Sequence, residues 1–337
     1  MLENLYLDEV ITSVWDLSNG YVFRNGFAFT SIDEPTNVYD AIIIRHPVKC
    51  NCWSPKTAHS YISPEEHIEL INKHKIEKAK IIAEDISFIT QCPSLKYLDI
   101  IPADTAPNNF DYSPLYAMPE IRSLCCRTLY GGSSEPFSTT VDLSKINGLR
   151  LADVGKGCLN FEKATSLERI HFSGYKELKD LKKLCNCKEL KRLTFLSCSL
   201  KSLDGAENLP KLQGIDVWYN RQICDISALR GCAESLRWLS LQNCPKITDF
   251  SYLSVLKNLE AVSLEGNNDL PDVDFLRNMK NIKWFICTMN VINGDLTPCL
   301  SVPYVDIKGR KHYNLKNKDL PKNGDKRGFI WEPQYLF

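Results

Sequence analysis

The chain has 337 residues, with 41 lysines and arginines balanced by 41 aspartates and glutamates. A net charge of zero predicts no general attraction to nucleic acid or to anionic lipid. No stretch approaches the roughly 18 apolar residues that a membrane span requires. The length exceeds that of one ordinary globular core, so we expect either two domains or an array of repeats.

The N-terminus and the cysteines bear on the compartment. Residues Met1 to Val10 carry acids where a signal peptide needs bases, and no apolar core follows them. The 14 cysteines do not form the dense pattern of a small disulfide scaffold. We therefore expect reduced thiols in a cytoplasmic protein, with a leaderless secreted form as the alternative.

Residues 1–75 are predicted to form a β-rich element followed by a capping helix. The segment around Asn25 and Gly26 alternates in polarity, and this dipeptide is a strong hairpin signal. Ser63 and Pro64 then begin a helix well, because serine caps an N-terminus and proline fits the first helical position. We expect this helix to end near Lys75 and to cover the end of the segment that follows.

Four side chains near this element have the chemistry of zinc ligands. They are His46, Cys50, Cys52 and His59. Two histidines around a Cys-x-Cys pair supply a tetrahedral set, although the spacing matches no zinc motif. Ordinary loop residues are the favoured interpretation, and we predict no cofactor.

An apolar pattern recurs along residues 76–307. It consists of an apolar residue, two variable ones, an apolar one, one variable one and an apolar one. The regular copies are Leu167/Ile170/Phe172, Leu190/Leu193/Phe195, Leu212/Ile215/Val217, Leu236/Leu239/Leu241, Leu259/Val262/Leu264 and Ile282/Phe285/Cys287. Their starting residues lie 22 to 24 positions apart. Looser copies begin at Ile76, Leu95, Ile121, Leu149 and Val302.

Two further positions repeat with the same period. Eight residues after the start, where the chain turns inward, a small or amide side chain recurs, and we expect it to be buried. These residues are Cys198, Asn220, Cys244, Asn267 and Asn290, with Tyr175 as the exception. In the second half of each repeat, apolar residues recur every three positions, which suits a short 3₁₀ turn.

This combination resembles the leucine-rich repeat, and in particular the short-repeat class of bacterial internalins and related cytoplasmic proteins. The resemblance covers roughly residues 76–307. It implies an α/β solenoid with a curved parallel sheet, short helical or 3₁₀ turns on the convex side, and a cap at each end. The family is a scaffold for many partners, so the resemblance says little about which partner binds.

Residues 308–337 are expected to form the C-terminal cap and tail, with the aromatic end from Phe329 to Phe337 packed over the last strand. Residues 308–327 carry eight bases against Asp319 and Asp325, whereas residues 1–40 carry seven acids against Arg24. Two solvated ends of opposite charge are the simpler interpretation. The alternative is a basic landing site for an acidic partner.

Strand parity predicts which side chains face the concave side of the sheet. The candidate partner-binding residues are Tyr97, Arg127, Arg169, His171, Arg192, Asp216, Trp218, Trp238, Gln242, Glu265 and Trp284. We expect the three tryptophans to be accessible, with Arg169 and Arg192 beside them, because interfaces favour tryptophan, tyrosine and arginine. The alternative is that the rings pack on one another and only stiffen the sheet.

No catalytic motif appears, since the chain has no phosphate-binding glycine loop, no Gly-x-Ser-x-Gly and no His-Glu-x-x-His. We therefore predict a non-catalytic module that binds a protein through its concave face, with no nucleic-acid or membrane partner. A narrower hypothesis is a bacterial immunity protein that neutralises a toxin. The alternatives from other classes are a metal-binding or enzymatic N-terminal element and an adaptor without a tight partner. The sequence predicts neither the partner nor the oligomeric state.

Overall fold

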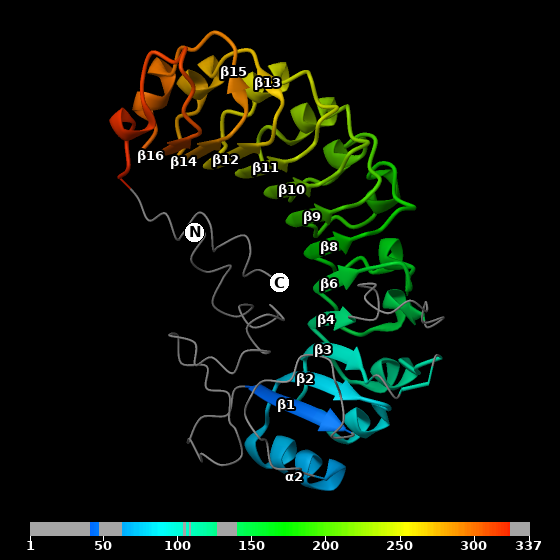
Figure 1. Cartoon of the computed structure of the whole chain (residues 1–337). Helices are drawn as coiled ribbons and strands as arrows, with labels where there is room; N and C mark the ends of the chain where they lie inside the picture. Colours follow the sequence, from blue (N-terminus) through cyan, green and yellow to red (C-terminus); the bar gives the residue numbers. More distant parts are fainter. Residues whose placement is uncertain (1–40, 47–62, 104–105, 108, 127–139, 324–337) are drawn as a thin grey trace. The chain divides into compact units, whose positions relative to one another are not determined.

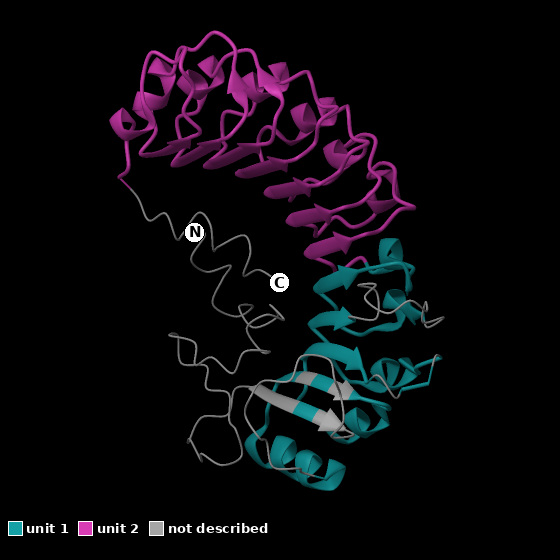
Figure 2. Cartoon of the chain, viewed as in Figure 1, with its two compact units in different colours: residues 1–164, 333–337 teal, residues 165–332 magenta. Residues whose placement is uncertain are grey.

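The structure is a computed structural model that describes residues 41–46, 63–103, 106–107, 109–126 and 140–323. The chain divides into two compact units, residues 1–164 with 333–337, and residues 165–332 (Figure 2). Several predictions fall outside the described residues, namely the hairpin at Asn25-Gly26, the aromatic tail, and the side chains of His46, Cys50, Cys52, His59 and Arg127.

The first unit contains a parallel sheet in which each strand pairs with the next along the chain (Figure 1). Its strands are β1 (Ala41–His46), β2 (Lys78–Ala83), β3 (Tyr97–Pro102), β4 (Ser123–Cys126) and β6 (Leu151–Val154). Short 3₁₀ helices follow them, namely η3 (Ser87–Gln91), η4 (Ser113–Ala117), η6 (Leu143–Lys145) and η7 (Phe161–Lys163). The two-residue strands β5 (Val141–Asp142) and β7 (Cys158–Leu159) form a separate pair.

The helix predicted to begin at Ser63 and Pro64 is present as α2 (Pro64–His74). The Ser63 hydroxyl accepts from the Glu66 backbone at 3.2 Å, and the Glu66 carboxylate accepts from the Ser63 backbone at 2.8 Å. This reciprocal pair satisfies two donors that helix geometry leaves open. The strand β1, which precedes the helix and pairs in parallel with β2, was not predicted.

The second unit repeats one strand and one 3₁₀ helix with the predicted period, the strands on its inner side and the helices on its outer side (Figure 1). Its main strands are β8 (Arg169–Ser173), β9 (Arg192–Leu196), β10 (Gly214–Trp218), β11 (Trp238–Gln242), β12 (Ala261–Glu265), β14 (Trp284–Cys287) and β16 (Tyr304–Ile307). The 3₁₀ helices are η8 (Lys182–Leu184), η9 (Ala206–Asn208), η10 (Ser227–Cys232), η11 (Ser251–Val255), η12 (Asp274–Asn278), η13 (Thr297–Ser301) and η14 (Asn317–Asp319). A short outer pair joins β13 (Asp269–Leu270) to β15 (Asn290–Val291).

The apolar positions of the repeat form the core, as predicted. Leu193, Leu239 and Val262 are fully buried in the second unit. Cys198 and Cys244 are buried in the turns after their strands, and burial raises the pKa of each thiol to about 11. The twelve cysteines among the described residues are free thiols.

The inward turn position is confirmed in part. Asn220 is buried and donates to the backbone oxygens of Phe195 at 2.9 Å and Trp218 at 2.8 Å. The prediction for Asn267 is wrong, because this residue is exposed and Asn268 donates to the Cys244 and Ile247 oxygens instead.

The local backbone accounts for this shift. Gly266 has a φ of +145°, whereas the equivalent residues of the two preceding repeats have φ of 52° to 55°. The turn therefore runs differently and presents its amide side chain one residue later. Asn290 in the next repeat is only half-buried and donates to the Asp269 carboxylate at 2.8 Å.

Candidate functional site

Side chains of the second unit line up in rows across its sheet, because neighbouring strands pair without any offset. One row holds Arg192, Gly214, Trp238, Ala261, Trp284 and Tyr304. The next holds Thr194, Asp216, Ser240, Ser263, Ile286 and Asp306, and the third holds Leu196, Trp218, Gln242 and Glu265. We call these three rows the concave face. Adjacent members of a row lie about 4.8 Å apart.

A buried carboxylate organises one end of the concave face. Asp216 is fully buried and accepts from the Nε and Nη2 atoms of Arg192 at 3.0 and 2.8 Å. The same oxygen accepts from the Thr194 hydroxyl at 3.2 Å, and the other oxygen accepts from the Trp238 indole nitrogen at 2.8 Å. Both carboxylate oxygens are therefore occupied by donors of this chain, which compensates the cost of burying the charge.

Gly214 lies between Arg192 and Trp238 in the first row. The guanidinium of Arg192 lies 5.0 Å from the ring centroid of Trp238, although β10 separates their strands. A Cβ at Gly214 would stand 3.4 Å from the Cγ of Arg192 and 3.5 Å from the Cβ of Trp238. These are ordinary van der Waals distances, so a methyl group would fit there as well. Arg192 crosses β10 over this position and stacks on the indole as a cation on an aromatic ring.

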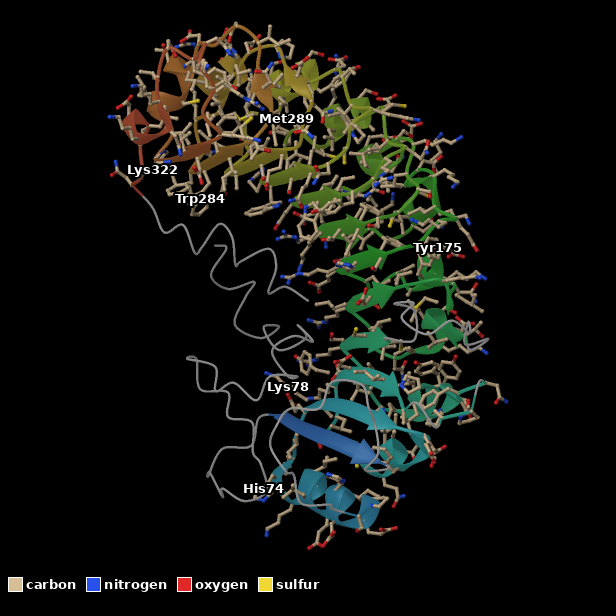
Figure 3. All side chains as sticks on the ribbon, viewed as in Figure 1. His74, Lys78, Tyr175, Trp284, Met289 and Lys322 are labelled. Carbon is tan, nitrogen blue, oxygen red and sulfur yellow. The ribbon has the colours of Figure 1, made fainter. Side chains whose placement is uncertain are left out.

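Five of the predicted residues are half-buried and gather on neighbouring strands. They are Trp218, Trp238, Gln242, Glu265 and Trp284. The Trp218 indole nitrogen donates to the Ser240 hydroxyl at 2.9 Å, and Ser263 donates to Glu265 at 2.8 Å. Trp284 lies on the strand side of the unit (Figure 3). Two of the three indoles thus have their N–H groups bound within the chain, which fixes the orientation of the rings.

Other predicted residues are buried. Arg192 lies beside Trp238, as expected, but both Arg192 and Arg169 are covered by their neighbours. The exposed fractions of residues Arg169 and Arg192 are 3% and 7%. Asp216 and His171 are buried as well, although parity assigned all four to the correct face. Large side chains on adjacent parallel strands cover one another, and Arg192 in particular is drawn down by its ion pair with Asp216.

Tyr97 is also buried, in the first unit. The Lys78 ammonium lies 5.5 Å from its ring centroid. Arg122 directly precedes β4, and a hydrogen bond with Tyr97 is the largest of the causes that raise its pKa. Tyr97 therefore lies between two cationic side chains of its own unit.

Tyr219 is an exposed aromatic residue that the sequence reasoning missed. Its side chain is 50% exposed, directly after Trp218, and its φ of 55° lies in the left-handed region. The equivalent residues of the neighbouring repeats are Ser197 and Asn243, which share this backbone conformation. Bulky residues are rare in the left-handed region. The aromatic residue at a turn position that holds serine or asparagine in the neighbouring repeats could therefore have drawn attention to Tyr219 in the sequence.

Within the described residues, no three histidine, cysteine, aspartate or glutamate side chains are grouped so as to hold a metal ion. The described helices are also all too short or too polar to cross a membrane. The chemistry of the concave face is that of fixed aromatic rings beside a neutralised ion pair.

Comparisons with known proteins bear on the fold. No protein-family model matches the chain, and no curated protein sequence matches it. An internalin of Listeria monocytogenes, InlF, is 14% identical with a TM-score of 0.47, over 76% of this chain and 87% of the internalin. A leucine-rich-repeat protein of Leptospira interrogans is 14% identical with a TM-score of 0.47, over 74% of this chain and 70% of that protein.

The structure of a TLR13–ssRNA13 complex gives a TM-score of 0.50 at 14% identity, over 80% of this chain and 47% of the TLR13 chain. Likeness at this identity concerns the fold alone. Together with the regular strands, turns and 3₁₀ helices described above, it shows that the chain has the leucine-rich-repeat solenoid fold.

Proposed function

We propose that the chain is a non-catalytic binding module that holds a protein partner on the concave face of its second unit. The contact patch consists of Trp218, Trp238, Gln242, Glu265 and Trp284, with Tyr219 at its edge. The observation that carries the proposal is the set of three half-buried tryptophans on β10, β11 and β14. Tryptophans fixed in this way are the residues that dominate protein interfaces, because little side-chain entropy is lost when they bind.

The buried charged residues support this patch rather than contact the partner. Asp216 accepts a hydrogen bond from the Trp238 indole nitrogen, and the Arg192 guanidinium stacks on the face of the ring. Arg169 and His171 lie on β8, next to Arg192 and Thr194 in the sheet. Tyr97 and Arg127, which strand parity also gave as candidate partner-binding residues, belong to the first unit and not to this patch.

The test is affinity purification from the native host with the full chain as bait, followed by titration of the captured protein. Changing Trp238 to Ala should weaken the complex by about 2 kcal/mol or more, which is about 30-fold in Kd. The matched control is Leu300→Ala, which removes an exposed apolar side chain on η13, outside the face. Circular dichroism checks that both variants keep the fold.

Two results would overturn the proposal. One is a partner that binds a Trp218, Trp238 and Trp284 triple-alanine variant as tightly as the wild type. The other is a captured ligand that nuclease removes, because the function would then be nucleic-acid binding.

The narrower hypothesis of an immunity protein rests on the irregular early repeats, the solenoid body and the basic end. It requires that the captured partner be a toxin. The activity of that toxin should fall in proportion to the amount of this chain added, up to one equivalent. A partner whose activity is unchanged by binding would leave the general binding function and remove the narrower one.

A further inference from the structure

The C-terminal cap of the second unit, residues 308–322, carries a concentration of positive charge that the concave face does not use. Its bases are Lys308, Arg310, Lys311, Lys316, Lys318 and Lys322, and its acid is Asp319. A run of charge can be merely solvated. These cations are available to a partner only if carboxylates of the chain itself do not neutralise them.

Uncharged polar side chains fix the cap to the end of the solenoid. The Tyr313 hydroxyl accepts from the Val291 backbone at 2.9 Å and donates to the Met289 oxygen at 3.3 Å. Asn314 accepts from the Leu296 backbone at 2.8 Å. These bonds tie the cap to β15 and η13, so its backbone is ordered by the unit before any partner arrives.

A second anchor lies further along the cap. Asn317 accepts from the Ile307 backbone at 3.1 Å and donates to Asp306 at 2.9 Å. Leu320 is buried, and the Pro321 oxygen accepts from the Val305 backbone at 2.9 Å. The cap is thus held by two anchors, the first against β15 and η13 and the second against the last strand, β16.

The lysines of the cap are exposed to solvent. Lys308, Lys311, Lys316 and Lys318 are exposed, and none of them forms an ion pair within the part of the chain that the structure describes. The carboxylates nearby already have partners. Asp295 accepts from Asn314 at 2.7 Å, and Asp319 accepts from the Lys316 backbone at 3.1 Å.

Arg310 adds a half-buried cation to this surface. Its Nη2 atom donates to the Thr288 oxygen at 3.4 Å, a long hydrogen bond. Its Nε atom is buried and meets no acceptor among the described residues. Its guanidinium therefore adds positive charge next to the exposed lysines without an ion pair among the described residues.

We infer that the cap is a second interaction surface, separate from the concave face, which binds an acidic segment of a protein. Charge complementarity selects an anionic partner. The chemistry favours carboxylates over nucleic acid, because the Tyr313 and His312 rings meet edge to face and both bond to strand backbone. The two rings therefore pack against each other and do not form parallel faces between which a base could stack.

The probe is a fluorescein-labelled oligoglutamate peptide, titrated with the full chain and followed by fluorescence anisotropy. Binding should be measurable at low salt and weaken as salt screens the lysines. Changing Lys308, Lys311, Lys316 and Lys318 together to Gln should weaken it about tenfold, since each exposed pair contributes a fraction of a kcal/mol. The matched control changes four exposed lysines of other repeats to Gln, namely Lys183, Lys201, Lys257 and Lys280, and should change the Kd less than twofold, roughly the scatter of such titrations.

Three outcomes would overturn the inference. The first is equal weakening in the cap variant and the control, which would mean a response to net charge alone. The second is that no binding is detected at low salt. The third is that a single-stranded oligonucleotide of equal charge binds more tightly than the peptide and is lost in the cap variant. The Trp238→Ala variant should bind the peptide normally, so this test is independent of the proposed function.

Discussion

Two regions of the second unit treat charge in opposite ways. On the concave face, Arg192 and Asp216 are buried, and each is neutralised by the other. On the cap, four lysines stand in solvent, while asparagine and tyrosine make the structural bonds. The difference shows that a charged side chain stabilises the fold where the chain supplies its counter-charge. Where the chain supplies no counter-charge, the side chain is available to a partner.

The largest expected effect breaks the first half of this comparison. Changing Asp216 to Asn keeps the shape but leaves Arg192 buried without a counter-charge, so the free energy of unfolding should fall by about 3 kcal/mol. Urea unfolding followed by circular dichroism measures it. The control is Glu189→Gln, which removes an exposed ion pair with Lys211 and should cost about 0.5 kcal/mol or less. If both variants lost the same amount, the burial of the pair would carry no special weight.

A smaller effect separates the ring of Trp238 from its hydrogen bond. Trp238→Phe keeps an aromatic face for Arg192 but removes the indole donor from Asp216. We expect a loss of about 1 to 2 kcal/mol in the free energy of unfolding, because one buried carboxylate oxygen loses its donor. The same urea titration checks this value. A variant as stable as the wild type would show that stacking alone holds the network.

Tyr219 tests a neutral residue that faces solvent as the cap lysines do. Asparagine tolerates left-handed backbone better than tyrosine and occupies the equivalent position, Asn243, one repeat later. Tyr219→Asn should therefore raise the free energy of unfolding by up to about 1 kcal/mol while weakening the proposed complex. Thermal unfolding and partner titration read the two effects separately. A loss of stability would mean that the tyrosine side chain packs against its neighbours.

The smallest effect is expected at the cap. Changing the four exposed lysines to Gln should alter the free energy of unfolding by about 0.5 kcal/mol or less, because no partner within the described chain is lost. Thermal unfolding at low and high salt provides the measurement. A large loss would assign these lysines to the fold and would contradict the contrast with the concave face.

The repeat could be predicted from the sequence because burial in a solenoid depends on local spacing. Leu239 and Val262 recur at fixed positions, so their place in the core needs no knowledge of distant residues. The same spacing placed Trp238 on the correct face. The turn at Asn267 could not be predicted in this way, because its course depends on the backbone angle of Gly266.

Exposure on the face could not be predicted from parity. Parity says towards which side a residue points but not what its neighbours cover. Arg192 is buried because it bonds to Asp216 and stacks on Trp238, which lie 24 and 46 residues further along the chain. The strand β1 was missed for a related reason, because no repeat pattern links it to β2.

The contact between Arg192 and Trp238 also has a consequence for how the unit unfolds. In an ideal repeat array each repeat touches only its immediate neighbours, so the array can fray from an end one repeat at a time. Arg192 on β9 reaches Trp238 on β11, which couples second neighbours. The repeats of β9, β10 and β11 should therefore open as one cooperative block, with a common free energy of opening when hydrogen exchange of their strand amides is measured. In that case three repeats that are separate in the sequence would share one unfolding step.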